Sequence, residues 1–216
     1  MKKTLLAGCV LALCSSAAMA ANDWHFAAGS DLWHAQGSGD INSVNPSYDN
    51  NYNWSGYALL EHGILVLPNI KFELANLDTS GGSFNNDLLT YNMDFYYRVF
   101  NNDLFNIDLG AAGRRYDGEF RYHGTDRSYT KDSVLAYAAA ELRIPSTSLS
   151  VFGDAHASSW GSDKTNDYRF GAAYKLPTMP LKVHAGWREV NLDLNHAGVD
   201  ANQNIDGWFV GGEMSF

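Results

Sequence analysis

Apolar and polar residues alternate along most of the chain that follows the N-terminal segment. The pattern is clearest over residues 89–99, where every odd position from Leu89 to Val99 is apolar or aromatic. The even positions, from Thr90 to Arg98, are polar or amphipathic. About ten such stretches occur in all. Successive side chains of a strand point to opposite faces, so each stretch predicts a strand with one apolar and one polar face.

Turn-forming residues separate these stretches at two kinds of spacing. The short links are residues 67–69, 101–103, 145–148 and 177–180. The long polar connections are residues 36–52, 78–87, 117–132, 159–167 and 193–206. Short turns at one end and long loops at the other are typical of bacterial outer-membrane barrels. We therefore expect an all-β, antiparallel, up-and-down transmembrane barrel of about ten strands, or eight if one hairpin lies above the membrane.

The first two strands are the least regular part of this pattern. The first is expected over residues 24–35 and the second over residues 54–66. Within the second, Glu61 and His62 are adjacent, so both cannot point inward.

A soluble β-sandwich would also show strands at regular spacing. Two features favour a membrane barrel instead. The stretches are close to the ~9–11 residues that a tilted spanning strand needs. Aromatic residues also fall near both ends of the predicted strands, as interfacial belts do. The outer belt is predicted from Trp54, Trp160, Tyr168 and Trp208, and the inner belt from Trp24, Phe100, Phe105, Tyr174 and Phe216.

The last strand of the chain is closed by an aromatic residue. One face of this strand presents Trp208, Val210, Gly212, Met214 and Phe216. A terminal aromatic on an alternating strand indicates an outer-membrane protein when the chain also begins with a secretion signal. We expect these five residues to act as the signal for barrel assembly.

The N-terminus supplies that secretion signal. Lys2 and Lys3 precede an apolar run that ends in Ala18-Met19-Ala20, a small-x-small cleavage site. The predicted organisation is a signal peptide over residues 1–20 and a barrel domain over residues 21–216. A lipoprotein signal with lipidation at Cys9 is the alternative, but its apolar region would be shorter than the ~7–15 residues usually needed.

Composition narrows the possible partners. The chain has 15 basic and 24 acidic residues, and removal of Lys2 and Lys3 takes its net charge from −9 to −11. Proteins that bind nucleic acids select basic surfaces, so no nucleic-acid partner is expected. Both cysteines lie in the signal and the histidines lack zinc-type spacing, so we expect no cofactor or metal.

The chain resembles a family of small Gram-negative outer-membrane barrels. The resemblance lies in the signal peptide, the strand spacing, the chain length and the closing sequence 211–216. That family is named for a Gly-Gly pair near the C-terminus, here Gly211-Gly212. The resemblance implies insertion by the barrel-assembly machinery through the last strand, with no activity to carry over. The expected partners are outer-membrane lipid, lipopolysaccharide, the assembly machinery and periplasmic chaperones, and the protein is expected to be a monomer.

The polar faces of the strands carry many charges of both signs. Those expected to point inward are Asp94, Arg98, Asp108, Arg114, Glu141, Arg143, Asp154, His156, Arg169, Lys175, Lys182, His184, Arg188 and Glu213. Buried charges are tolerated when they are paired, so we expect ion pairs that plug a narrow lumen. The favoured function is structural or concerned with surface interactions, and a small solute-specific channel is one alternative.

The other alternative is a hydrolase, with its candidate catalytic residues within 154–158. Asp154 and His156 share a strand face, where the carboxylate can orient the imidazole. The pair is similar to the Asp-x-His of omptin proteases, with Asp78 as the facing acid, although omptins use two aspartates there. His156-Ala157-Ser158, followed by Asp167, resembles lipid A deacylases, whose pair faces lipid, whereas the alternation points His156 inward.

A calcium-loop pattern is a weaker candidate. Residues 202–207 followed by Glu213 resemble such a loop, but the first position is Asn202. We interpret this segment as a loop and turn composition. The acidic outer connections could still share bridging divalent cations with lipopolysaccharide.

Overall fold

The computed structural model describes residues 24–41, 47–82, 84–122, 125–158, 164–196 and 199–216. The predicted signal peptide lies outside these residues. None of the described residues forms a helix long and apolar enough to cross a membrane. The strands are β1 (Trp24–Ile41), β2 (Asn50–His62), β3 (Asn69–Asn76), β4 (Thr79–Gly81), β5 (Phe84–Asn101), β6 (Phe105–Tyr122), β7 (Thr125–Arg143), β8 (Leu149–Ser158), β9 (Lys164–Lys175), β10 (Leu181–His196) and β11 (Val199–Ser215).

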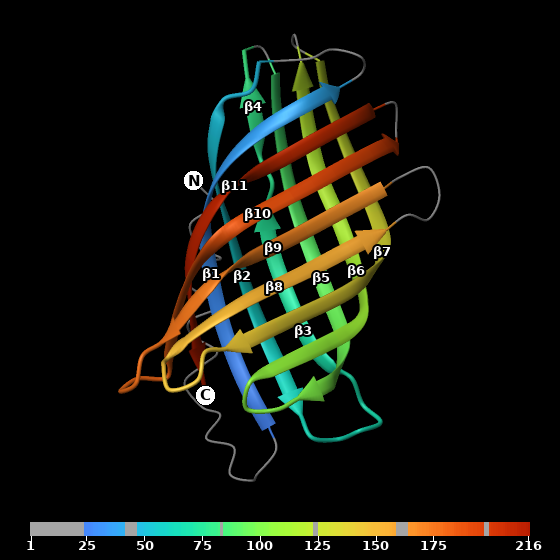
Figure 1. The fold of residues 1–216 in the computed structure, drawn as a ribbon. Coiled ribbons are helices and arrows are strands. Elements are labelled where there is room, and N and C mark those ends of the chain that lie inside the picture. Colours follow the sequence, from blue (N-terminus) through green and yellow to red (C-terminus); the bar gives the residue numbers. More distant parts are fainter. Residues whose placement is uncertain (1–23, 42–46, 83, 123–124, 159–163, 197–198) are drawn as a thin grey trace.

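The strands form a closed antiparallel barrel. Each strand pairs with its neighbour in the chain, except that β3 and β4 do not pair with each other. β1 also pairs with β11, from Ala27 opposite Ser215 to Ile41 opposite Ala201. These first and last strands lie side by side in Figure 1. β3 and β4 pair with successive parts of β5, so together they form one wall segment. The wall therefore has ten segments, which confirms the predicted fold and excludes the eight-stranded alternative.

Short turns join the strands at the lower end of Figure 1, as predicted. The second strand ends earlier than expected, at His62 rather than Val66. Residues 63–68 leave the wall, and the side chains of Leu65 and Val66 are almost fully exposed there. The prediction was wrong because an apolar turn extends the apparent strand pattern.

The connections at the other end are much shorter than expected. Residues 117–132 were predicted as a loop, yet β6 and β7 continue pairing until Tyr122 lies opposite Thr125. Similarly, β10 and β11 pair until His196 lies opposite Val199. The polar residues in these segments are the outward face of continuing strands. Most of the predicted loops are therefore strand hairpins, which extend beyond the membrane-spanning wall.

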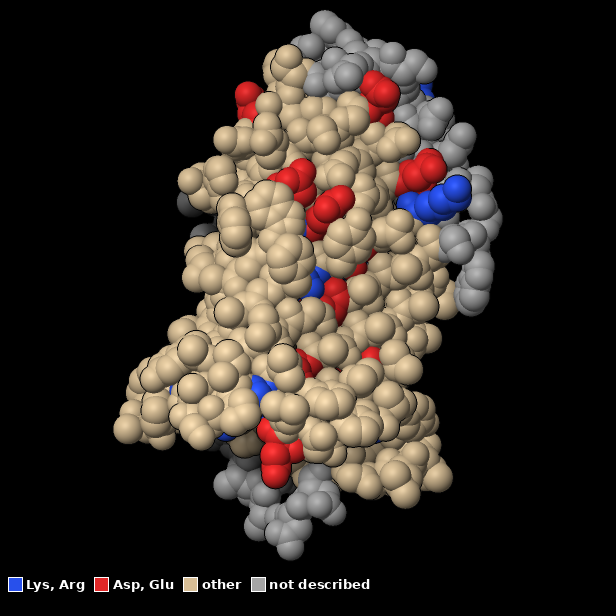
Figure 2. Space-filling model, in the orientation of Figure 1, with Lys and Arg blue, Asp and Glu red and all other residues tan. Residues whose placement is uncertain are grey.

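The exposed fractions confirm the predicted faces of the spanning strands. On β5, Met93 is 42% exposed on the outside, whereas its neighbour Asp94 is 0% exposed in the lumen. Glu61 points inward and His62 packs outside against Trp24, with ring centroids 5.1 Å apart. An apolar exterior around a charged interior is the arrangement that a lipid bilayer requires. In Figure 2, charged side chains occupy little of the visible wall.

Aromatic side chains mark both edges of this apolar band. At the outer edge, Trp208 packs edge-on against Trp187, with ring centroids 5.2 Å apart. At the inner edge, Phe216 packs against Phe26 at 5.7 Å and closes the last strand onto the first. Of the other predicted belt residues, Phe105 is half-buried and stacks on Phe100 at 4.7 Å. The rest are exposed on the outside: Trp54, Trp24, Phe100, Tyr168 and Tyr174. Trp160 lies outside the described residues.

The closed wall, its apolar exterior and the two aromatic belts have the same consequence. The chain is an integral β-barrel of the outer membrane.

Candidate functional site in the barrel lumen

The outer part of the lumen is filled by apolar side chains. Most come from strand segments above the aromatic belt, whereas Leu77 lies between β3 and β4 and Phe209 adjoins the belt residue Trp208. Each is at most 8% exposed: Trp33, Ala35, Leu77, Phe84, Leu88, Tyr116, Phe120, Tyr129, Val190, Leu192, Ile205 and Phe209. We call these twelve residues the outer plug. The predicted plug was a set of ion pairs, so this apolar closure is a correction. The alternation continues in the hairpins, but most of their inward residues are apolar, and the buried polar residues among them, such as Asn86 and Gln203, are uncharged.

A network of buried ion pairs lies directly below the outer plug. Asp167 accepts from Arg188 and pairs with Arg114, with oxygen-to-nitrogen distances of 2.9 Å in each case. Arg188 also lies 3.3 Å from Glu73. Its guanidinium sits 5.4 Å from the ring centre of Trp33, so the network is in direct contact with the plug.

Arg169 on β9 is the second centre of this network. It donates to Asp154 at 3.1 Å and to Asp31 at 3.1 Å. Asp31 also bonds the Nε2 of His184, at 2.5 Å. All four side chains are nearly buried, and each charge is compensated by at least one partner. The predicted ion pairing of the lumen therefore exists at this level of the barrel.

The structure places His156 and Asp154 on the same inward face but gives them different partners. His156 is 3% exposed, and its Nε2 lies 3.0 Å from an oxygen of Asp94. The same nitrogen lies 3.3 Å from the side-chain amide of Asn92, which accepts from Arg114 at 3.0 Å. Asp154 bonds Arg169 instead. This is the packed, ion-paired arrangement that sequence analysis associated with a structural role.

Asp78 belongs to a separate cluster. Its carboxylate accepts from the backbone N–H of Leu88 at 2.9 Å and from the side chain of Asn76 at 2.8 Å. These bonds close the gap between β3 and β4. The contacts of the described residues do not bring Asp78 together with His156, so the omptin-like constellation is not assembled.

The other two candidate sites are also spread apart. Asp167 is held by two arginines in the network, and His156 faces the lumen rather than lipid. Residues 202–207 are not a loop, because they pair with β1 and β10 throughout. Within the described chain, no group of three acidic, histidine or cysteine side chains is placed to hold a metal ion.

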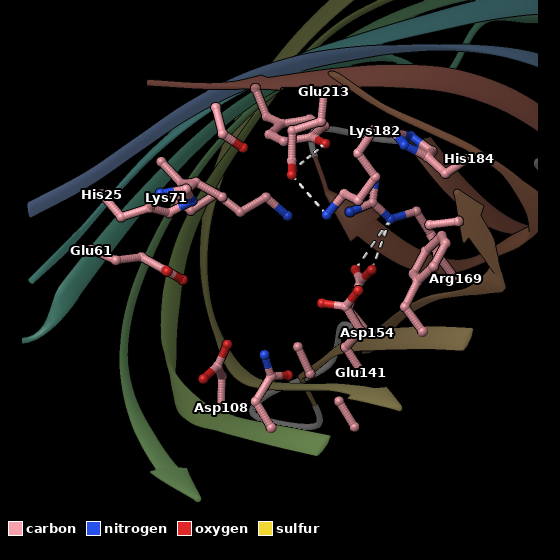
Figure 3. A pocket seen from close by; sticks show the side chains of 18 of the residues that line it. His25, Glu61, Lys71, Asp108, Glu141, Asp154, Arg169, Lys182, His184 and Glu213 are labelled. Atoms are coloured by element: carbon pink, nitrogen blue, oxygen red, sulfur yellow. Dashed lines mark hydrogen bonds and ion pairs between the residues drawn. The ribbon is translucent and has the colours of Figure 1, made fainter. Parts of the chain in front are cut away.

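The lower lumen is a polar cavity of about 330 Å³ that reaches the turn between β9 and β10. Figure 3 looks into this cavity. Its deep end meets Arg169, and its mouth includes Pro180 and Leu181. Arg98 pairs here with both Glu61 and Asp108, and Lys182 pairs with Glu213 at 2.7 Å.

Four central members of the lumen were not among the predicted inward residues: Asp31, Lys71, Glu73 and Asp167. Asp167 was assigned to a loop, although it falls on the inward phase of β9. Lys71 and Glu73 lie two residues apart on β3 and pair with each other at 3.3 Å. Extending the alternation through short or polar strands would have identified all four.

The residues predicted as an assembly signal share the outer face of β11. Trp208, Val210, Met214 and Phe216 are each more than 40% exposed to the outside. The neighbouring Gly211 faces inward, where an added Cβ would lie 1.9 Å from Asp31 and 2.6 Å from His184. Only glycine leaves room for the contact between Asp31 and His184. Gly212 meets no such obstacle, since its nearest neighbours are at 3.8 Å.

No family model matches the sequence, and no curated protein matches it either. Solved structures do resemble the barrel. Neisserial surface protein A is 13% identical, with a TM-score of 0.49, 88% of this chain and 97% of that chain being covered. The translocator domain of autotransporter NalP from Neisseria meningitidis is 11% identical, with a TM-score of 0.46 and coverages of 97% and 94%. The β domain of the Bordetella autotransporter BrkA is 13% identical, with a TM-score of 0.45 and coverages of 90% and 99%. Similarity at this level says nothing about activity.

Proposed function

We propose that this protein is a closed outer-membrane barrel whose role is structural or concerned with surface interactions. The observation that carries the proposal is the outer plug, which fills the lumen above the buried ion pairs. A solute would have to displace both layers to cross. An outer-membrane hydrolase is less well supported, because His156 and Asp154 are each engaged with luminal partners.

The outer hairpins are the part of the chain available to surface partners. Their outward faces carry acids such as Asp117, Glu119 and Asp132, interspersed with Arg115 and Arg121. Carboxylates can share divalent cations with the phosphates of lipopolysaccharide. We infer that lipopolysaccharide is the first partner of these hairpins and that the barrel acts as a monomer. Loss of lipopolysaccharide binding on addition of a chelator would support this, whereas binding that is indifferent to cations would contradict it.

The last strand supports the proposed membership in the Gly-Gly family and the assembly route that it implies. Gly211 is required by the packing of Asp31 and His184, so the pair has a structural reason. The apolar outer face that ends in Phe216 is suited to periplasmic chaperones and the assembly machinery. Deletion of Phe216 should reduce insertion in cells more than it reduces stability after refolding. Normal insertion of the truncated chain would count against this role.

Solute flux tests the closed lumen directly. Refolded into liposomes, the protein should give no swelling with small sugars or amino acids. Flux through the unaltered protein would overturn the proposal. Peptide or lipid A hydrolysis that disappears in His156→Asn would favour the hydrolase instead.

A further inference from the structure

The lower cavity of the lumen has no part in the proposed role, yet it has the size and lining of a ligand site. Its volume of about 330 Å³ lies within the range of ~300–1,000 Å³ that is usual for small-molecule pockets. It opens toward the short turns, which face the periplasm in outer-membrane barrels. Its deep walls carry aromatic rings, including Tyr96 and Tyr137 in contact at 5.5 Å.

The wall formed by β2, β3, β5, β6 and β7 carries three carboxylates, those of Glu61, Asp108 and Glu141. Its cations are Arg98 and Arg143, because the charge of Lys71 is compensated by Glu73 at 3.3 Å. Arg98 is shared by two carboxylates, those of Glu61 at 2.5 Å and Asp108 at 2.8 Å. Glu141 lies on the same side and accepts only from the hydroxyl of Ser150, at 2.6 Å, among the described residues. Figure 3 shows Glu61, Asp108 and Glu141 along this side. The wall therefore keeps a negative surplus that can attract a cation.

The facing wall carries the opposite surplus. Lys175 on β9 and Lys182 on β10 lie directly opposite each other in the strand register, and both line the cavity. Like charges placed opposite each other on one face are destabilising. Glu213 neutralises Lys182, but no carboxylate of the described residues lies within ion-pairing distance of Lys175. Arg143 belongs to the other wall, two residues from Glu141 on β7, and its guanidinium donates to the carbonyl of Asn102.

Opposed surpluses of charge in one blind cavity suit a ligand that carries both signs at separate ends. We propose that the lower cavity binds a small zwitterion of the short-peptide class from the periplasmic side. The ligand ammonium lies toward Glu61, Asp108 and Glu141. The ligand carboxylate lies toward Lys175 and Lys182, where it relieves the repulsion between the two lysines. Aromatic rings of the deep wall contact the apolar part of the ligand.

Calorimetric titration of the detergent-refolded, full barrel with trialanine tests this inference. The matched probes are acetyl-trialanine amide, which has no charge, putrescine, which has only positive charges, and succinate, which has only negative charges. Trialanine should bind, and each of the other three should bind at least about tenfold more weakly, because a charge-assisted contact is lost. Equal or tighter binding of any one of them would overturn the assignment, as would no binding of trialanine.

Two conservative variants locate the binding in the cavity. Lys175→Gln and Glu141→Gln remove one charge from each wall without breaking an ion pair between described residues, and each should weaken trialanine binding about tenfold. The controls are Lys164→Gln, at the outer end of the same strand as Lys175, and Glu119→Gln, on the outer surface. Heat-modifiable gel migration verifies that each variant folds. Unchanged binding in both wall variants, or equal losses in the controls, would contradict the proposal.

Discussion

The spanning wall and the outer hairpins are built on the same two-residue repeat with opposite polarity. In the spanning part of β5, Met93 faces lipid and Asp94 is buried in the lumen. In the outer part of β6, Glu119 faces outward and Phe120 is buried in the plug. The repeat therefore specifies a strand with two faces, and the surroundings decide which face is apolar. Lipid requires apolar side chains outside, whereas water requires them inside.

The largest expected effect comes from the charged core of the spanning part. Asp167→Asn leaves Arg114 and Arg188 buried with less compensation, which should cost about 3–5 kcal/mol. Chemical unfolding in lipid vesicles, followed by tryptophan fluorescence, measures the loss. Asp132→Asn is the control, because that carboxylate pairs with Arg115 on the exposed surface. A similar loss in both variants would show that burial does not distinguish the two ion pairs.

The apolar core of the outer hairpins should be nearly as sensitive. Leu192 is 2% exposed within the plug, and Leu192→Ala should cost about 2–5 kcal/mol in the same unfolding assay. Leu32→Ala, on the outer face of β1, should cost less because Leu32 is 64% exposed. If Leu32→Ala were the more damaging change, the hairpins would not form a packed core above the membrane.

A charge on the outside distinguishes the two regions by their surroundings. Met93→Arg places a guanidinium on the lipid face and should cost about 2–4 kcal/mol. Thr130→Arg introduces the same group on the outward face of a hairpin, close to Asp117, and should leave stability unchanged. Refolding yield and the unfolding midpoint in vesicles measure both. Equal penalties would place the two positions in the same environment.

The smallest effect is expected at the hairpin surface. Arg115 is bonded to Asp132 by two hydrogen bonds of 2.7 and 2.8 Å, but both side chains are more than half exposed. Exposed ion pairs contribute little because water and salt screen them. Arg115→Gln should therefore leave the unfolding midpoint unchanged. A clear fall in the midpoint would indicate that this pair is shielded by lipid headgroups.

The strands and their faces were predictable because the alternation is local. Residues 89–99 and 105–114 contain the pattern in full, and the inward positions of β5 and β6 followed from it. The lengths of the outer hairpins could not be predicted, because polar residues such as Asp117 and Glu119 are typical both of a loop and of the outer face of a strand. The decisive information was in the flanking residues Tyr116 and Phe120, whose side chains are buried in the outer plug.

The partners within the lumen were beyond prediction from one sequence. Asp31 and Arg169 are separated by 138 positions and meet across the barrel interior. Their contact depends on the strand register and on how the wall closes, which alternation does not specify. His156 illustrates the consequence for function. Its inward direction was predicted correctly, but its bond to Asp94 on a distant strand was not.

The inversion of polarity along one strand is the central claim, and a nitroxide scan of β6 tests it most directly. The chain after the predicted signal has no cysteine, so single cysteines at positions 109–119 can each carry a label. Labels at the outward positions 109, 111 and 113 should be reached by oxygen dissolved in lipid. Those at 115, 117 and 119 should be reached by a water-soluble nickel complex, and those at the buried positions 112, 114, 116 and 118 by neither. Access of the nickel complex to all odd positions would contradict a membrane-spanning wall, and access of oxygen to all of them would contradict the water-exposed hairpin.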